Sequence, residues 1–222
     1  MEQLGHRISA SIGGIAVLVG VLLLLSSFSW VPSSVLAPVV GPQRVERPAD
    51  GYAVSLPFDW EHADARSIKT DGTEDEWWDR DQVDPVRHHA AFVEDGGLLL
   101  ARPRSPFVDE ICRVLDLSEF AHMPPAWSSV DDAKAFFDAS PAEPDAIDTQ
   151  TAVMGLPAGP VLCIDFVMRN GDEWRDYLFT DGTDWHMLSC GAPGSAPRGR
   201  WLSIAETFEF LPRKASASIR VD

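Results

Sequence analysis

Positive charge is scarce in this chain. Its 222 residues include 18 Lys and Arg against 34 Asp and Glu, which gives a formal net charge of −16 at pH 7. Surfaces that bind nucleic acid neutralise phosphates with basic side chains, and anionic lipid headgroups attract basic segments. The acidic composition therefore argues against nucleic acid and anionic headgroups as partners.

Charged side chains are missing altogether between Ile8 and Val31. As a helix, this stretch would be about 36 Å long at about 1.5 Å per residue, and a bilayer core is roughly 30 Å thick. Arg7 is the last charge before the stretch and Arg44 the first after it, while Trp30 stands where an interfacial aromatic is expected. The stretch therefore predicts a single transmembrane anchor.

A cleaved signal peptide is the alternative for the same stretch, with Ser27-Phe28-Ser29 as a passable cleavage site. The stretch contains no cysteine, which excludes a lipid anchor there. Both interpretations place the rest of the chain outside the cytoplasm. The chain is expected to begin with a short cytoplasmic N-terminus (residues 1–7) and the anchor or signal sequence (residues 8–31). A Pro-rich tether (residues 32–50), one extracytoplasmic α+β domain (residues 51–212) and a polar tail (residues 213–222) are expected to follow.

Cysteine is also rare, with three residues, all in the exported part. An oxidising compartment allows one disulfide and leaves one thiol. Cys163 lies inside the alternating segment VLCIDFV, where a thiol is usually a small packed group. Cys112 and Cys190 each lie at the end of an apolar run. We therefore expect a Cys112–Cys190 disulfide, although the sequence alone allows all three pairings.

The rest of the pattern consists mostly of strands with short connections, which favours antiparallel pairing. Ser129 or Ser128 is expected to cap a helix in the middle of the chain. The hairpin over Asp181-Gly182 has two possible registers, pairing Leu178 with either Trp185 or Met187. The expected strands cover residues 52–56, 98–101, 111–117, 147–154, 160–169, 174–179, 185–190 and 208–211, with a second helix over 198–205. These elements predict an α+β fold.

Two motifs together resemble the PsbP-like fold, in the form found in exported actinobacterial PsbP-like or LpqN-like proteins. One is the opening segment GYAVSLPFDW at residues 51–60, and the other is the closing segment RWLSIAETFEFLP at residues 200–212. The resemblance implies a PsbP-like sandwich, an antiparallel sheet flanked by helices, and a binding or assembly module without a catalytic set.

An acidic segment over residues 71–84 is not expected from that family. It carries seven carboxylates and one base, with Trp77-Trp78 in its middle. Its spacing fits a calcium loop poorly, because Thr73 and Glu76 occupy positions that need Asp or Asn and Gly. A solvated loop is favoured. Paired tryptophans either pack on the core or dock a partner, so Trp77 and Trp78 are candidate partner-docking residues.

Catalytic and zinc motifs fail on spacing. Ser195 lacks the G-x-S-x-G pattern, and His88-His89 are adjacent and so diverge on any regular element. The alternative function is a hydrolase in which Asp165, with Asp176 or Glu173, supplies acid–base chemistry. The favoured expectation is a non-catalytic module without a cofactor, anchored in the plasma membrane and bound to an envelope protein or component.

Overall fold

The computed structural model describes residues 41–67, 92–105, 108–119, 127–139, 145–194 and 197–213. Two compact units are present. The first is described only at residues 41–43 and 57–59, where Gln43 Nε2 donates a hydrogen bond to the Pro57 carbonyl oxygen at 3.1 Å. The second comprises residues 44–56 and 60–222 and contains nearly all of the described secondary structure.

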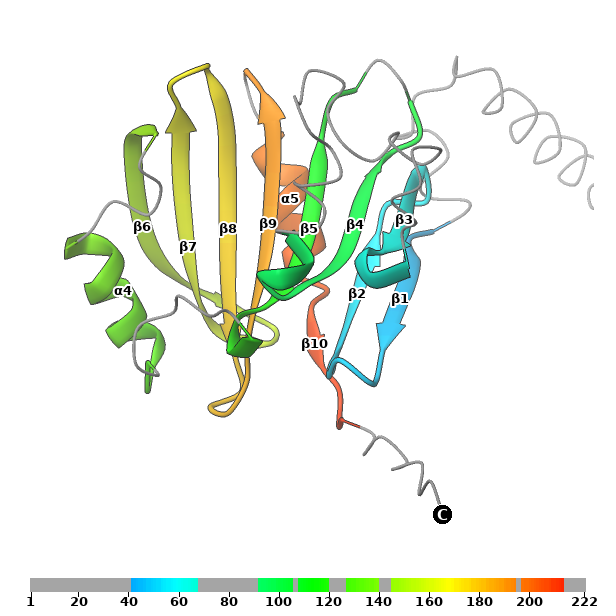
Figure 1. Ribbon diagram of the computed structural model, residues 1–222, viewed down its shortest axis with the longest axis horizontal. Coiled ribbons are helices and arrows are strands. Elements are labelled where there is room, and N and C mark those ends of the chain that lie inside the picture. Colours follow the sequence, from blue (N-terminus) through cyan, green and yellow to red (C-terminus); the bar gives the residue numbers. More distant parts are fainter. Residues whose placement is uncertain are drawn as a thin grey trace, which may run out of the picture. The chain divides into compact units, whose positions relative to one another are not determined.

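A seven-stranded antiparallel sheet dominates the second unit (Figure 1). Its strand order is β3-β4-β5-β9-β8-β7-β6. The sheet therefore consists of two meanders, β3 to β5 and β6 to β9, which meet where β5 pairs with β9. The strands are β3 (Trp60–Asp64), β4 (Gly97–Pro103), β5 (Ile111–Asp116), β6 (Ala146–Leu156), β7 (Gly159–Met168), β8 (Asp172–Thr180) and β9 (Trp185–Pro193).

A second sheet joins the beginning and the end of the domain. It has the order β1 (Gln43–Arg47), β2 (Tyr52–Leu56) and β10 (Glu209–Phe210), with Phe210 opposite Tyr52. The two motifs that resemble the PsbP-like fold thus meet in adjacent strands. β1 lies within the segment that we expected to be a tether, so ordered structure begins before Gly51.

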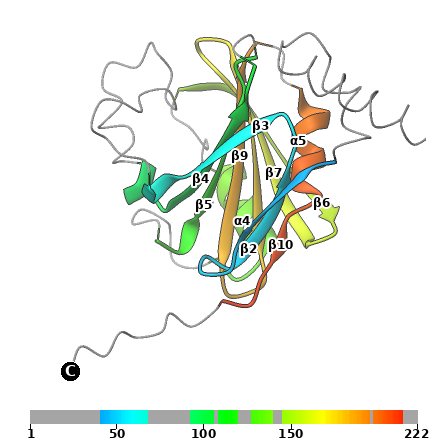
Figure 2. The same ribbon diagram turned by 90° about the vertical axis from the view of Figure 1, so that its right-hand side faces the viewer.

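The two faces of the seven-stranded sheet have different covers. Helix α5 (Arg198–Ala205) supplies Trp201, β2 supplies Tyr52 and the residue before β10 supplies Phe208 to a core that includes Cys163 and Tyr177. Helix α4 (Val130–Ala139) packs on β6 and β7 and contributes Val130 and Ala133 to the opposite core, which includes Ile164 and Leu178. Figure 2 shows α5 and the small sheet together at one side of the large sheet. The described part is an α+β fold, as expected.

The predicted N-cap of the central helix is confirmed. Ser129 Oγ accepts a hydrogen bond from the Asp132 backbone N–H at 3.1 Å, and the Ser128 hydroxyl bonds the Asp132 carboxylate. The hydrogen bond from Ser128 lowers the pKa of Asp132. Asp131 and Asp132 occupy the first turn, where carboxylates interact favourably with the helix dipole.

The hairpin registers resolve one open alternative. Leu178 pairs with Met187 and Thr180 with Trp185, so residues 181–184 form a four-residue loop. Asp181 Oδ1 accepts hydrogen bonds from the backbone N–H groups of Thr183 and Asp184, which closes that loop.

A further strand was not expected from the sequence, and the predicted anchor lies outside the described residues. Trp60 begins strand β3, which is not among the strands expected from the sequence; its side chain is fully buried. Short 3-10 helices, η1 (Ala65–Ser67) and η3 (Leu117–Glu119), follow β3 and β5. No helix among the described residues is long and apolar enough to cross a membrane, and residues 8–31 lie outside them.

Candidate functional site

The predicted disulfide is present. Cys112 on β5 and Cys190 on β9 lie directly opposite each other and are bonded, with a Cα–Cα distance of 4.1 Å. Both residues are almost completely buried. Cys163 is the remaining thiol, and burial raises its pKa to about 11. This thiol is therefore protonated and packed, as its place in the middle of a strand indicated.

The candidate partner-docking residues Trp77 and Trp78 lie outside the described residues, as does the acidic segment over residues 71–84. The docking and calcium hypotheses therefore stay predictions. Within the described ranges, no cluster of three or more His, Cys, Asp or Glu side chains could hold a metal ion.

The carboxylates proposed for acid–base chemistry do not form one pair. Asp165 lies opposite Arg175, whereas Asp176 lies opposite Ile164, so Asp165 and Asp176 project from opposite faces of the sheet. The Arg175 Nε and Nη2 atoms each donate to the Asp165 carboxylate at 2.6 Å. The sheet thus separates the two residues that a hydrolase would need together.

Glu173 shares the face of Asp165, and a cation links them. Arg198 on α5 donates from Nη2 to Glu173 Oε2 at 3.1 Å, and its Nη1 lies 3.9 Å from Asp165 Oδ2. Together with Arg175, these side chains form an ion-pair network between the sheet and the N-terminal end of α5. The network holds α5 in place.

A polar row crosses the opposite face of the sheet and was not found from the sequence. Arg113 on β5 pairs with Ser189 on β9, which pairs in turn with Asp176 on β8. The Arg113 guanidinium carbon lies 4.3 Å from the centre of the Trp174 ring. Burial lowers the pKa of Arg113 to about 10, and the negative charge of Asp176 opposes this shift. Arg113 therefore remains charged at neutral pH, supported by an aromatic face and a nearby carboxylate.

Gly191 makes this arrangement possible. It lies opposite Trp174 in the β8–β9 pairing, and a Cβ atom at Gly191 would come within 2.5 Å of the indole ring. The indole therefore lies directly over the glycine backbone. An arginine at an inward position of the apolar segment ICRVLD was the one sequence signal for this cluster.

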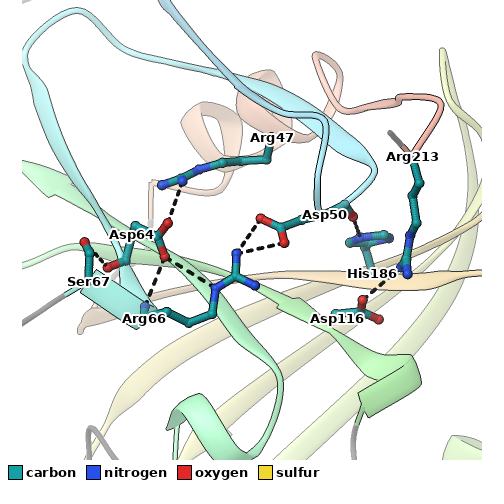
Figure 3. A network of polar contacts seen from close by, with 8 residues as sticks. All are labelled: Arg47, Asp50, Asp64, Arg66, Ser67, Asp116, His186 and Arg213. Atoms are coloured by element: carbon teal, nitrogen blue, oxygen red, sulfur yellow. Dashed lines mark hydrogen bonds and ion pairs between the residues drawn. The ribbon is translucent and has the colours of Figure 1, made fainter. Parts of the chain in front are cut away.

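A second polar network joins the β1–β2 turn to β3 (Figure 3). Arg66 Nη2 donates to both oxygens of the Asp50 carboxylate, at 2.7 and 2.8 Å. Arg47 Nη1 donates to Asp64 Oδ2 at 2.6 Å. These ion pairs fix the small sheet beside β3.

The same network reaches β9 and the C-terminal end of the described chain. His186 is completely buried, and its Nε2 donates to the Asp50 carbonyl oxygen at 3.0 Å. Burial lowers the pKa of His186, so the ring is neutral. Arg213 Nη2 donates to the buried Asp116 carboxylate at 2.9 Å. These contacts connect structural elements of the domain and stabilise the fold.

Strand β6 has no buried residue along its eleven positions. Ile147 is 65% exposed and Val153 43% exposed, and Phe136 on the adjoining α4 is 38% exposed. These are three of the four large hydrophobic residues that are exposed in the described ranges. Two of these three residues lie on β6 and the third on α4, which packs against it, so the exposed apolar side chains concentrate on two contacting elements.

No protein-family model matches the chain, and no curated protein matches it. Among solved structures, it is similar to the solution structure of cyanobacterial PsbP (CyanoP) from Synechocystis sp. PCC 6803. The two are 14% identical, the match covers 78% of this chain and 95% of that chain, and the TM-score is 0.40. The matched protein has the family name to which the two sequence motifs point.

Proposed function

We propose that the chain is a non-catalytic, membrane-anchored binding or assembly module of the cell envelope, with its folded domain outside the cytoplasm. The buried Cys112–Cys190 disulfide carries this proposal. Such bonds form and persist in oxidising compartments, whereas cytosolic proteins rarely contain them. The apolar stretch over residues 8–31 provides the attachment to the membrane.

The geometry of the described carboxylates supports a non-catalytic role. Asp165 and Glu173 are held by Arg175 and Arg198, and Asp176 lies on the other face of the sheet. Those contacts stabilise the fold. In contrast, the exposed apolar residues on β6 and α4 provide a surface that another molecule can cover.

Fractionation of cells that express the full chain tests anchoring and location. After a carbonate wash, the intact chain should remain in the membrane pellet, and protease added outside the cytoplasmic membrane should digest the domain. Thiol labelling of the denatured, unreduced protein should modify only Cys163. Recovery of a shortened chain in the supernatant would refute the anchor, and labelling of all three cysteines would refute the oxidising location.

Crosslinking in cells tests the binding role. A photoreactive amino acid placed at exposed positions of the domain should give a defined adduct with one envelope component, which mass spectrometry identifies. Adducts absent at every exposed position of the described domain would refute the binding role.

A further inference from the structure

Strand β6 is an unusually open sheet edge. It is the last strand of the seven-stranded sheet and pairs with β7 on its inner side along its whole length. Within the described ranges, no backbone hydrogen bond joins its outer side to another segment. An edge of this kind presents a row of backbone donors and acceptors that another extended chain can pair with.

Pro160 identifies which backbone groups face outward. It lies opposite Gly155 in the β6–β7 pairing and has no N–H, so it cannot exchange the two hydrogen bonds of a hydrogen-bonded pair, and this position belongs to the non-hydrogen-bonded class. Hydrogen-bonded and non-hydrogen-bonded pairs alternate along an antiparallel ladder. Thr149, Thr151 and Val153 therefore belong to the same class as Gly155, and the N–H and C=O groups of all four residues point away from β7.

The sequence of β6 carries few of the features that usually protect an edge. AIDTQTAVMGL contains no proline and no lysine, and Asp148 is its one charged residue. The single irregularity lies between Ala146 and Asp148, which leaves the ladder regular from Asp148 to Leu156. Natural edges are commonly protected by charges, proline, bulges or short length.

The opposite edge of the same sheet shows that protection. Strand β3 has five residues, among them the charged Glu61 and Asp64. Arg102 Nε donates to Glu61 at 2.7 Å, and Arg47 of the small sheet binds Asp64. One edge of the sheet is therefore short and ion-paired, whereas the other is long and open.

Charge indicates what kind of chain would pair there. β6, the residue before it and helix α4 carry one base, Lys134, and five acidic residues, all exposed: Asp131, Asp132, Asp138, Asp145 and Asp148. The whole chain has a net charge of −16, so a second copy would be repelled. A cationic segment would be attracted to the same region, and apolar side chains in that segment could cover Val153 and Ile147.

We propose that the outer edge of β6 binds an extended, cationic segment of a partner protein, which adds as an eighth strand to the sheet. This inference rests on the proposed binding role and assigns its site. Backbone hydrogen bonds to Thr149, Thr151, Val153 and Gly155 supply the pairing, and basic side chains alternating with apolar ones supply selectivity.

The test uses the full chain in a mild detergent and a synthetic heptapeptide in which lysine and valine alternate. The matched control peptide replaces each lysine with glutamate. Hydrogen exchange measured by mass spectrometry should show slower exchange in the segment 146–156 when the lysine peptide is added, with up to four amides protected, those of residues 149, 151, 153 and 155. The glutamate peptide should give no protection.

Val153→Pro is the decisive variant, because it removes an outward N–H and leaves the ladder with β7 intact. It should weaken binding of the lysine peptide at least tenfold, whereas Val153→Thr, which keeps the N–H and the β-branched shape, should bind within about twofold of the wild type. An intact Cys112–Cys190 bond and an unchanged melting temperature would verify that Val153→Pro is folded.

Three results would overturn the proposal. Equal binding of both peptides would contradict the proposed attraction of a cationic segment. Unchanged binding by a folded Val153→Pro variant would contradict binding at the outer edge of β6. Self-association that Val153→Pro abolishes would make the occupant a second copy of this chain. Crosslinking in cells separates this failure from failure of the binding role, because a specific adduct away from β6 would keep the role and reject the site.

Discussion

Removal of the Cys112–Cys190 bond should destabilise the domain by an amount that follows from the length of chain it closes. The two cysteines are 78 positions apart. The chain-entropy relation gives a loss of about 15 cal/mol/K for a loop of that length, or about 4.5 kcal/mol at 25 °C. Because domains of this size are stable by about 5–15 kcal/mol, the double variant Cys112→Ala/Cys190→Ala should lose between about a third and nearly all of its stability.

Urea unfolding of the full chain in mild detergent, followed by tryptophan fluorescence, measures this loss. Cys163→Ala is the matched control, because it removes a buried sulfur and leaves the bridge intact. After the cost of the control is subtracted, the double variant should be less stable by about 3–5 kcal/mol, with a larger urea m-value because its unfolded state is more expanded. A corrected loss below about 1 kcal/mol with an unchanged m-value would refute the argument.

Two further perturbations test the interior of the domain. Gly191→Ala should lower the free energy of unfolding by about 1–3 kcal/mol because its Cβ would collide with the Trp174 ring. The control Gly155→Ala, which has no atom within 4 Å of the new Cβ, should not lower the melting temperature. Equal changes in melting temperature for the two variants would contradict this packing. Burial lowers the pKa of His186, so the unfolded chain, with an ordinary histidine pKa of about 6.5, binds the proton more readily. The stability of the folded domain should therefore be full above about pH 6.5 and fall as the pH drops below it. His186→Gln keeps a donor for the Asp50 carbonyl, and it should make the melting temperature depend less on pH in this range.

Strand positions were predictable where successive side chains alternate between the two faces of the sheet. The segment VLCIDFV places Ile164 on the α4 side and Cys163 on the α5 side, as its pattern indicated. Helix α5 begins and ends at the predicted residues, and α4 has the predicted cap. These features depend on residues that are close together in the sequence, so they could be predicted from it.

β1 and β3 could not be predicted because tertiary partners determine them. QRVER and WEHAD are mostly polar, and ion pairs such as Arg47–Asp64 stabilise them in their sheets. The placement of Arg113 depends equally on its surroundings, since a charged residue on an inward face requires Trp174 and Asp176 beside it. The open edge of β6 depends on the strand order, which spacing along the chain does not specify.

The junction of β5 with β9 has a consequence for how the molecule assembles. Every other pairing in the large sheet joins strands that follow one another along the chain, so each half can form from contacts within its own segment. The junction has to bring together residues 78 positions apart, and contacts so distant in the chain form slowly because the loop between them must close first. We expect the two halves to form early and independently. Oxidation of Cys112 and Cys190 then links the halves covalently once β5 has paired with β9.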